Sequence, residues 1–318
     1  MELSRITPEL RGPVRRFPAM PIESEWFRRL SRLALPLIRS GGVPGVTIEQ
    51  AIPGMPGVRV HRPELVRSRA ALLWIHGGGL VTGAARMDDR MCGGTAAELG
   101  IVVVAADYRL APEFPYPTPL DDCHTAWTWL LRNAAHLDVD PGRVIIGGQS
   151  AGGGLAAALA QRLHDEGAVE PVAQWLFCPM LDDRTAARRE LDEIGHRVWN
   201  NRHNRYGWSA YLRAEPGGEQ TPGHAVPARR TDLTGLPPAW IGVGDVDLFH
   251  DEDLDYAERL RAAGVPVTFE VVPGAPHGFE AWAPKTAVSR DFVRAGRDWL
   301  AGFTGPADGP GQQPRAVE

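Results

Sequence analysis

The chain has 318 residues, of which 43% are hydrophobic and 23% are charged, and its formal net charge at pH 7 is −5. These proportions are typical of a globular protein, and the acidic balance argues against a nucleic-acid partner. No apolar run approaches the length of a membrane span, and the N-terminus has no apolar signal segment. We therefore expect a soluble cytoplasmic protein without stable membrane insertion.

The residue spacing indicates neither a metal site nor a cofactor. The three cysteines, Cys92, Cys123 and Cys178, show no Cys-x-x-Cys spacing, which predicts buried free thiols in a reducing compartment. No cluster of histidines and cysteines has zinc spacing, and the glycine-rich stretches lack the pattern of a phosphate loop. We expect no metal and no bound cofactor.

The first 45 residues carry short helical patterns. Residues 25–35 are amphipathic, with apolar side chains at helical spacing and arginines opposite them. A basic amphipathic helix is able to lie on a membrane surface. Pro36 ends this helix early, however, so we expect it to lie on its own domain.

From residue 46 onward, apolar strand patterns alternate with helical patterns. The predicted strands are 46–52, 58–61, 70–75, 101–106, 144–147, 174–177, 239–243 and 267–272. The predicted helices are 87–99, 119–135, 151–165, 251–263 and 283–302. Continuous apolar strands separated by helices are typical of an α/β protein, in which helices cover both faces of a mostly parallel sheet.

Two segments depart from this alternation. Residues 181–236 have no strand pattern, which predicts a helical insertion that forms a cap together with residues 1–45. The charged run at 182–190 is expected to be a solvated face. The main domain then consists of residues 46–180 and 237–303, and the polar, glycine-rich and proline-rich residues 304–318 are expected to be a disordered tail.

The most informative stretch is residues 144–160, where a buried strand pattern ends in glycines and a helix of small residues follows. Between them, Gly148-Gln149-Ser150-Ala151-Gly152 fits the G-x-S-x-G pattern of a nucleophile elbow. In that motif a strained strand-to-helix turn projects a serine hydroxyl above the sheet. In a glycine-rich chain the pattern alone also fits an idle serine in a loop. The strand before it and the helix after it favour Ser150 as a nucleophile.

A serine nucleophile needs a base to accept its proton and an acid to orient that base. On this strand–helix arrangement the chain order is serine, acid, histidine. His277 follows the last predicted strand, at the kind of strand end where catalytic groups gather. His203, by contrast, lies among asparagines and arginines, and we expect it to face solvent. Asp245 and Asp247 both follow the preceding strand, and the pattern alone does not choose between them.

His76-Gly77-Gly78-Gly79 follows the buried strand 70–75. Acyl transfer places negative charge on a carbonyl oxygen, which nearby backbone N–H groups stabilise. Glycine allows the backbone to approach that oxygen closely. In enzymes with a nucleophile elbow, such a loop acts together with the N–H of the residue after the nucleophile, which is Ala151 here.

Four motifs in this order resemble the bacterial hormone-sensitive lipase-like carboxylesterases, which have the α/β-hydrolase fold. The motifs are His76–Gly79, Asp107–Pro117, Gly148–Gly153 and His277–Phe279, within residues 72–282. The resemblance implies an eight-stranded sheet and a cap built from the N-terminal segment and the insertion. It also implies that Gly78 and Gly79 join Ala151 as oxyanion donors.

The resemblance also bears on the acid and on the cap. The family's acid lies in an Asp-Pro-Leu-x-Asp-Glu stretch, with which Asp247–Glu252 aligns, and this favours Asp247 over Asp245. In the insertion, residues 208–212 are similar to the family's helix over the acyl pocket, which predicts Trp208 and Tyr211 as substrate-pocket residues.

Two further implications concern charge and assembly. Gln149 stands where many family members have an aspartate before the nucleophile, so the polarity beside the serine differs. The family often pairs edge strands into dimers, which makes strand 267–272 a candidate homodimer interface.

The resemblance predicts hydrolysis of short- to medium-chain carboxylic esters through an acyl-enzyme. The partner is then a small-molecule ester. An amidase, a lactonase or a deacetylase with the same three side chains stays open, and so does a non-catalytic small-molecule receptor. The presence of His277 favours an enzyme over a receptor. Activity should fall at acid pH, because a protonated imidazole cannot accept the serine proton.

Overall fold

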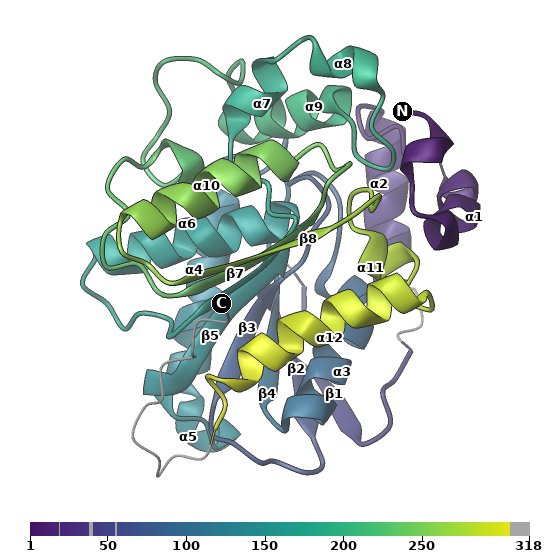
Figure 1. Ribbon diagram of the computed structural model, residues 1–318. Helices are drawn as coiled ribbons and strands as arrows, with labels where there is room; N and C mark the ends of the chain where they lie inside the picture. Colours follow the sequence, from purple (N-terminus) through teal and green to yellow (C-terminus); the bar gives the residue numbers. More distant parts are fainter. Residues whose placement is uncertain (19, 38–40, 55, 306–318) are drawn as a thin grey trace.

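The computed structural model describes residues 1–18, 20–37, 41–54 and 56–305, which form a central sheet with helices on both faces (Figure 1). The eight strands follow the order β1-β2-β4-β3-β5-β6-β7-β8. Their bounds are β1 Val46–Ile52, β2 Gly57–Pro63, β3 Ala71–Ile75, β4 Val102–Asp107, β5 Val144–Gln149, β6 Gln174–Phe177, β7 Ala239–Gly244 and β8 Val267–Val272. β2 is antiparallel to β1 and β4, and the other pairs are parallel. The predicted mostly parallel, eight-stranded sheet is confirmed.

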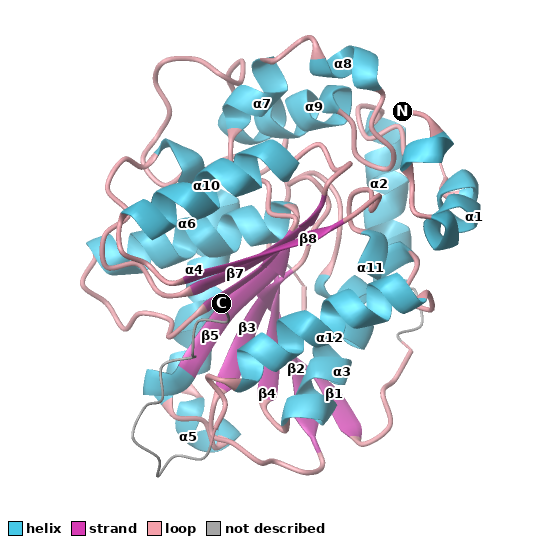
Figure 2. Cartoon of the chain, in the orientation of Figure 1, coloured by secondary structure: helices cyan, strands magenta, loops and turns pink. Residues whose placement is uncertain are grey.

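Both faces of the sheet are buried. In β3, Leu73 and Ile75 pack into the core on one face, and Leu72 and Trp74 pack on the other, because successive strand side chains alternate. The first face is covered by α4 (Thr118–Arg132), α6 (Ala151–Asp165) and α10 (His250–Ala262). The second is covered by α1 (Pro8–Arg16), α3 (Asp89–Leu99) and α12 (Ala287–Ala301) (Figure 2). This burial explains the continuous apolar strand patterns.

The largest differences from the predicted helix bounds, three or four residues, are at two helix ends. The helix predicted over 119–135 ends at Arg132, and a separate turn, α5 (Ala134–Leu137), follows it. The helix predicted over 283–302 begins only at Ala287, where the Thr286 side chain caps it. Pro284 disfavours helical backbone in the residue before it. Ahead of that break, α11 (Phe279–Trp282) is a single turn directly after the His277 loop.

The insertion at 181–236 is helical, as expected, and contains no strand. It comprises α7 (Asp183–Ala187), α8 (Leu191–Ile194), α9 (Asn201–Leu212) and the 3₁₀ turn η5 (Pro227–Arg229). These helices lie above the carboxyl ends of the parallel strands (Figure 1). The expectation of a wholly solvated charged run is wrong at Asp183, which is fully buried. Its carboxylate accepts a hydrogen bond from Arg229 at 2.7 Å, so pairing offsets the cost of burial.

The N-terminal helix α2 (Glu25–Ala34) packs on its own domain, as expected, but through its arginines. Arg28 is buried, and Arg32 donates to the backbone carbonyls of Val81 and Ala111. Phe27 packs against the core, whereas the other large apolar side chains of the helix, Trp26, Leu30 and Leu33, are exposed. Backbone carbonyls at the packing surface therefore decide which face of α2 turns inward.

The remaining described elements are 3₁₀ turns, namely η1 (Leu3–Arg5), η2 (Leu35–Leu37), η3 (Ala85–Asp88) and η4 (Pro141–Arg143). Within the described part of the chain, no helix combines the length and the apolar character needed to cross a bilayer. The predicted disordered tail lies outside the described residues, apart from Thr304 and Gly305. Cys92, Cys123 and Cys178 are buried free thiols, as predicted.

Candidate active site

Ser150 lies at the sharp turn between β5 and α6. Its backbone dihedrals are φ 56° and ψ −121°, a region that side-chain-bearing residues rarely occupy, so the turn is strained as a nucleophile elbow requires. The Ser150 N–H donates to the Phe177 carbonyl at 2.8 Å, which anchors the turn to the end of β6. At Gly152 only glycine fits, because a Cβ there would lie 2.0 Å from the carbonyl oxygen of Ile75.

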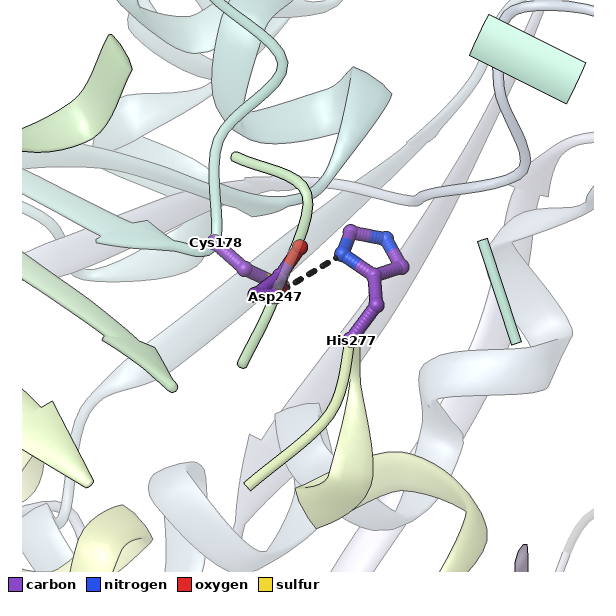
Figure 3. Close-up of side chains that lie close together, drawn as sticks. All are labelled: Cys178, Asp247 and His277. Atoms are coloured by element: carbon purple, nitrogen blue, oxygen red, sulfur yellow. Dashed lines mark hydrogen bonds and ion pairs between the residues drawn. The ribbon is translucent and has the colours of Figure 1, made fainter. Parts of the chain in front are cut away.

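Ser150, His277 and Asp247 form one hydrogen-bonded chain. The Ser150 Oγ lies 2.8 Å from His277 Nε2. His277 Nδ1 lies 2.8 Å from Asp247 Oδ2, and Figure 3 shows this bond. The other oxygen of Asp247 accepts the Phe249 N–H at 3.0 Å. The three residues are only 5%, 6% and 5% exposed, so the chain of bonds is shielded from bulk water.

The structure separates the two aspartates that follow β7. Asp245 is exposed, and its Oδ1 accepts the Gly274 N–H at 2.6 Å, which fixes the loop after β8. Asp247, two residues later, is buried and meets His277. β7 and β8 are parallel neighbours, so the loops that leave their carboxyl ends lie side by side and bring the acid to the histidine.

The glycine loop after β3 passes directly beside Ser150. A Cβ on Gly77 would lie 3.4 Å from the Ser150 Cβ. Gly79 has φ +61°, and a Cβ there would lie 2.1 Å from the Trp199 ring. The N–H groups of the first turn of α6, beginning with Ala151, point out of the helix start. The predicted donors Gly78, Gly79 and Ala151 are thus brought to the same end of the sheet as the serine.

His76 and Tyr108 support this loop from below. Their rings stack with centroids 4.2 Å apart and planes 11° from parallel. His76 Nδ1 donates to the Gly77 carbonyl at 2.8 Å, and the Tyr108 hydroxyl donates to the His76 carbonyl at 3.0 Å. Burial lowers the pKa of His76, so the ring is neutral. Tyr108 belongs to one of the four sequence motifs, but the motif does not predict its contact with His76.

Gln149 links the serine turn to the histidine loop. Its Nε2 donates to Glu280 Oε1 at 2.5 Å. Glu280 lies on α11, three residues after His277, and burial raises the pKa of its carboxyl. Glu280 belongs to none of the sequence motifs. The only available signal was the amide of Gln149, which is half-buried beside the nucleophile and gains a partner in Glu280.

One group of described residues has the spacing of a metal site. Ligand atoms of Cys178, Asp247 and His277 lie within 4.8 Å of one another (Figure 3). Two of these atoms, however, already form the bond between His277 and Asp247. Burial also holds the pKa of the Cys178 thiol well above its usual range, which disfavours the thiolate that a metal needs. The group fits an acid–base pair better than a metal centre.

Helix α9 covers the glycine loop. A Cβ on Gly207 would lie 2.7 Å from the Gly79 carbonyl oxygen. Trp208 and Tyr211, the predicted pocket residues, lie on this helix and are 2% and 1% exposed. The Trp199 ring, just before α9, has its centroid 6.2 Å from that of His277.

The expectation that His203 faces solvent is wrong. Its ring lies 5.5 Å from the Trp199 ring and is partly buried. The Asn200 side chain accepts the His203 N–H and so fixes the start of α9. The helix then turns His203 toward the site, although its sequence neighbours are polar.

This fold, with a serine at a strained strand-to-helix turn bonded to a histidine and an aspartate, defines the class of α/β hydrolases. Residues 72–281 match the family described as "alpha/beta hydrolase fold". Because the match covers well over half of the chain, the chain belongs to this family. The resemblance to hormone-sensitive lipase-like carboxylesterases is confirmed by this match and by its relatives.

Among those relatives, the "Carboxylic ester hydrolase LipN" of Mycobacterium tuberculosis is 36% identical over 72% of this chain, and the match spans 63% of that protein's length. The "Carboxylesterase NlhH" of the same species is 34% identical over 76% of this chain and 78% of its own length. The solved structure titled "Bacterial Heroin Esterase" has a TM-score of 0.87 and 32% identity, and covers 95% of this chain and 99% of its own.

Proposed function

We propose that the chain is a serine carboxylesterase that hydrolyses short- to medium-chain carboxylic esters through an acyl-enzyme. Its family and its relatives, which are named as carboxylic ester hydrolases, make it an ester-hydrolysing enzyme. The observation that carries the assignment of residues is the unbroken chain of two 2.8 Å hydrogen bonds from Ser150 through His277 to Asp247.

In the proposed mechanism, His277 Nε2 accepts the hydroxyl proton as the Ser150 Oγ attacks the ester carbonyl carbon. Asp247 holds the imidazole in the required tautomer and stabilises its charge. The oxyanion accepts hydrogen bonds from the N–H groups of Gly78, Gly79 and Ala151.

Collapse of this tetrahedral intermediate expels the alcohol, which takes the proton from His277 and leaves an acyl-enzyme. Water then attacks the acyl carbon while His277 removes its proton. The second intermediate releases the carboxylic acid and returns the proton to Ser150.

The first test is release of p-nitrophenol from acetate, butyrate, octanoate and palmitate esters by the wild type and by Ser150→Ala. We expect turnover to peak at the short and medium chains, because α9 lies directly on the glycine loop. Ser150→Ala should lower kcat/KM by about 10⁴-fold or more. Equal turnover by the variant would exclude Ser150 as the nucleophile.

Substrate comparisons also distinguish an esterase from the other enzymes that could use the same three side chains. Turnover of anilides or lactones that exceeds turnover of every ester, and that is lost in Ser150→Ala, would favour an amidase or a lactonase. Cleavage of acetyl groups without measurable cleavage of the butyrate and octanoate esters would favour a deacetylase. Ligand binding without any Ser150-dependent turnover would favour a receptor.

Three further statements are part of the proposal. The segments 1–45 and 181–236 act as the cap, supported by the position of α9 over the glycine loop. A cytoplasmic location is supported by the three free thiols. Homodimerisation through β8 is supported by its position at the edge of the sheet, and size-exclusion chromatography of a Val271→Lys variant tests it.

A further inference from the structure

The inner side of the segment from Trp199 to Tyr211 buries polar atoms that have no hydrogen-bond partner. Seven of the twenty such side-chain atoms among the described residues lie in this short segment. Asn204 is the extreme case, because it is 0% exposed and both its Oδ1 and its Nδ2 are unpaired. The Trp208 Nε1 and the Tyr211 hydroxyl are also buried and unpaired.

These groups share one face of α9. Residues three, four and seven positions apart lie on the same side of a helix, so Asn204, Gly207, Trp208 and Tyr211 form a continuous strip. The strip faces the glycine loop, since Gly207 is the residue whose added Cβ would lie 2.7 Å from the Gly79 carbonyl oxygen. The unpaired amide of Asn204 is therefore one helical turn from the contact between α9 and the predicted oxyanion loop.

Apolar side chains pack beside this strip. Trp199, Trp208 and Tyr211 belong to one large buried hydrophobic cluster that also contains Met180. A buried polar group without a partner costs stability, whereas a group that gains a partner recovers that cost. A plain alkyl chain placed against this strip would leave all of these groups unpaired. A substrate oxygen in the same place would accept a hydrogen bond from Asn204, Trp208 or Tyr211.

We propose that this strip is a polar subsite, with Asn204 at its centre, that binds an ether, carbonyl or hydroxyl oxygen carried by the ester at a distance from the bond that is cleaved. The proposal rests on the esterase function above and names its substrate class, which is oxygen-bearing esters rather than plain alkyl esters. Asn204 then determines specificity and does not touch the reacting atoms.

Two matched pairs of esters test the subsite on either side of the scissile bond. The acyl pair is ethyl pentanoate and ethyl 3-methoxypropanoate, and the alcohol pair is butyl acetate and 2-methoxyethyl acetate. Within each pair one CH₂ is replaced by oxygen at the same length. Each kcat/KM is divided by the rate of alkaline hydrolysis of the same ester, which removes the electronic effect of the oxygen.

We expect the wild type to prefer the oxygen-bearing ester about tenfold in one pair, and that pair identifies the side of the substrate that reaches α9. Asn204→Leu should abolish this preference, by raising turnover of the alkyl ester and lowering that of its partner, because the amide can no longer donate. Asn204→Ala serves if the leucine variant does not fold. Ser209→Ala, a partly buried position on the same helix, should leave the ratio unchanged.

Different results would overturn the polar subsite and the esterase function on which it rests. Turnover that depends on Ser150 but shows no oxygen preference in either pair would overturn the subsite and leave the esterase function standing. A preference that persists in both Asn204 variants would also overturn it. Absence of Ser150-dependent turnover on all four esters would overturn the esterase function, and the subsite with it.

Discussion

Polar side chains are buried in two regions of the molecule, and their hydrogen bonding differs. One region is the set of strand ends that carry Ser150, His277 and Asp247, and the other is the inner face of α9. Along the serine–histidine–aspartate chain, each side chain is bonded to the next, and Asp247 is further fixed by the Phe249 N–H. On α9, Asn204 is equally buried and has no partner. A fixed hydrogen-bond network is preorganised for one reaction. Unpaired polar groups form hydrogen bonds only when a bound ligand supplies the partner atoms. We therefore expect the strand ends to carry out the reaction and α9 to select the substrate.

The largest loss of activity is expected from Asp247→Asn, which changes the hydrogen-bonded serine–histidine–aspartate chain. The amide has the shape of the carboxylate but holds His277 in the wrong tautomer, so kcat should fall by about 10⁴-fold. Asp245→Asn is the matched control, because Asp245 bonds to the Gly274 N–H and not to the histidine. Its kcat should stay within a few-fold of the wild type in a p-nitrophenyl butyrate assay. If Asp245→Asn were the inactive variant, the acid would be Asp245.

The next largest loss of activity is expected at Gly79, where the glycine loop beside the serine meets the segment that carries α9. Gly79→Ala would place a Cβ 2.1 Å from the Trp199 ring, at a backbone φ of +61°. The loop or the ring must then move, and loss of one oxyanion donor typically lowers kcat by about 10²–10³-fold. Gly218→Ala is the control, because its nearest neighbour would be the Glu215 carbonyl at 3.6 Å. Equal kcat in the two variants would separate Gly79 from the site.

The structure joins the three predicted residues of the paired region in one hydrogen-bonded chain, and two of the three carry a local signal in the sequence. Ser150 lies between a strand pattern and a helix pattern, and His277 follows the last predicted strand. The choice of Asp247 over Asp245 needed the family resemblance, since both follow β7. The structure distinguishes them through the Gly274 N–H, which occupies Asp245, and that contact joins two loops far apart in the sequence.

The unpaired region was predicted poorly because its signals are not local. The polar neighbours of His203 suggested solvent, but the packing of α9 on the glycine loop decides which side of the helix is buried. The same holds for α2, where Arg28 is buried and Arg32 donates to the backbone carbonyls of Val81 and Ala111. Amphipathic spacing predicts a helix but not which of its faces meets a partner.

Glu280, which lies close to the histidine loop, also has an unpaired buried atom, its Oε2. Burial raises the pKa of its carboxyl above that of the unfolded chain. Over the pH range just above the ordinary glutamate pKa, the folded state therefore keeps a proton that the unfolded state has lost. The unfolding free energy falls as pH rises through that range, by about 1.4 kcal/mol for each unit by which the pKa is raised.

Glu280→Gln removes this dependence and keeps an acceptor for the Gln149 amide. Urea unfolding at several pH values between about 4 and 8 should therefore show the variant gaining stability relative to the wild type as pH rises. Other titrating groups cancel in that difference. A constant difference across the range would mean that Glu280 ionises alike in the folded and unfolded states.

The smallest effect is expected from the Tyr211 hydroxyl, and it is a gain in stability. The Tyr211 hydroxyl is buried and unpaired, so Tyr211→Phe removes a desolvation cost and keeps the edge-on ring contact with Tyr116. The unfolding free energy should rise by about 1 kcal/mol. Tyr256 is the matched control, since it is 0% exposed but its hydroxyl accepts a hydrogen bond from Gln161 at 3.0 Å. Tyr256→Phe should lower stability by a similar amount. If urea unfolding gave both tyrosines the same sign, the Tyr211 hydroxyl would have a partner in the free enzyme, and α9 would be paired in the same way as the strand ends.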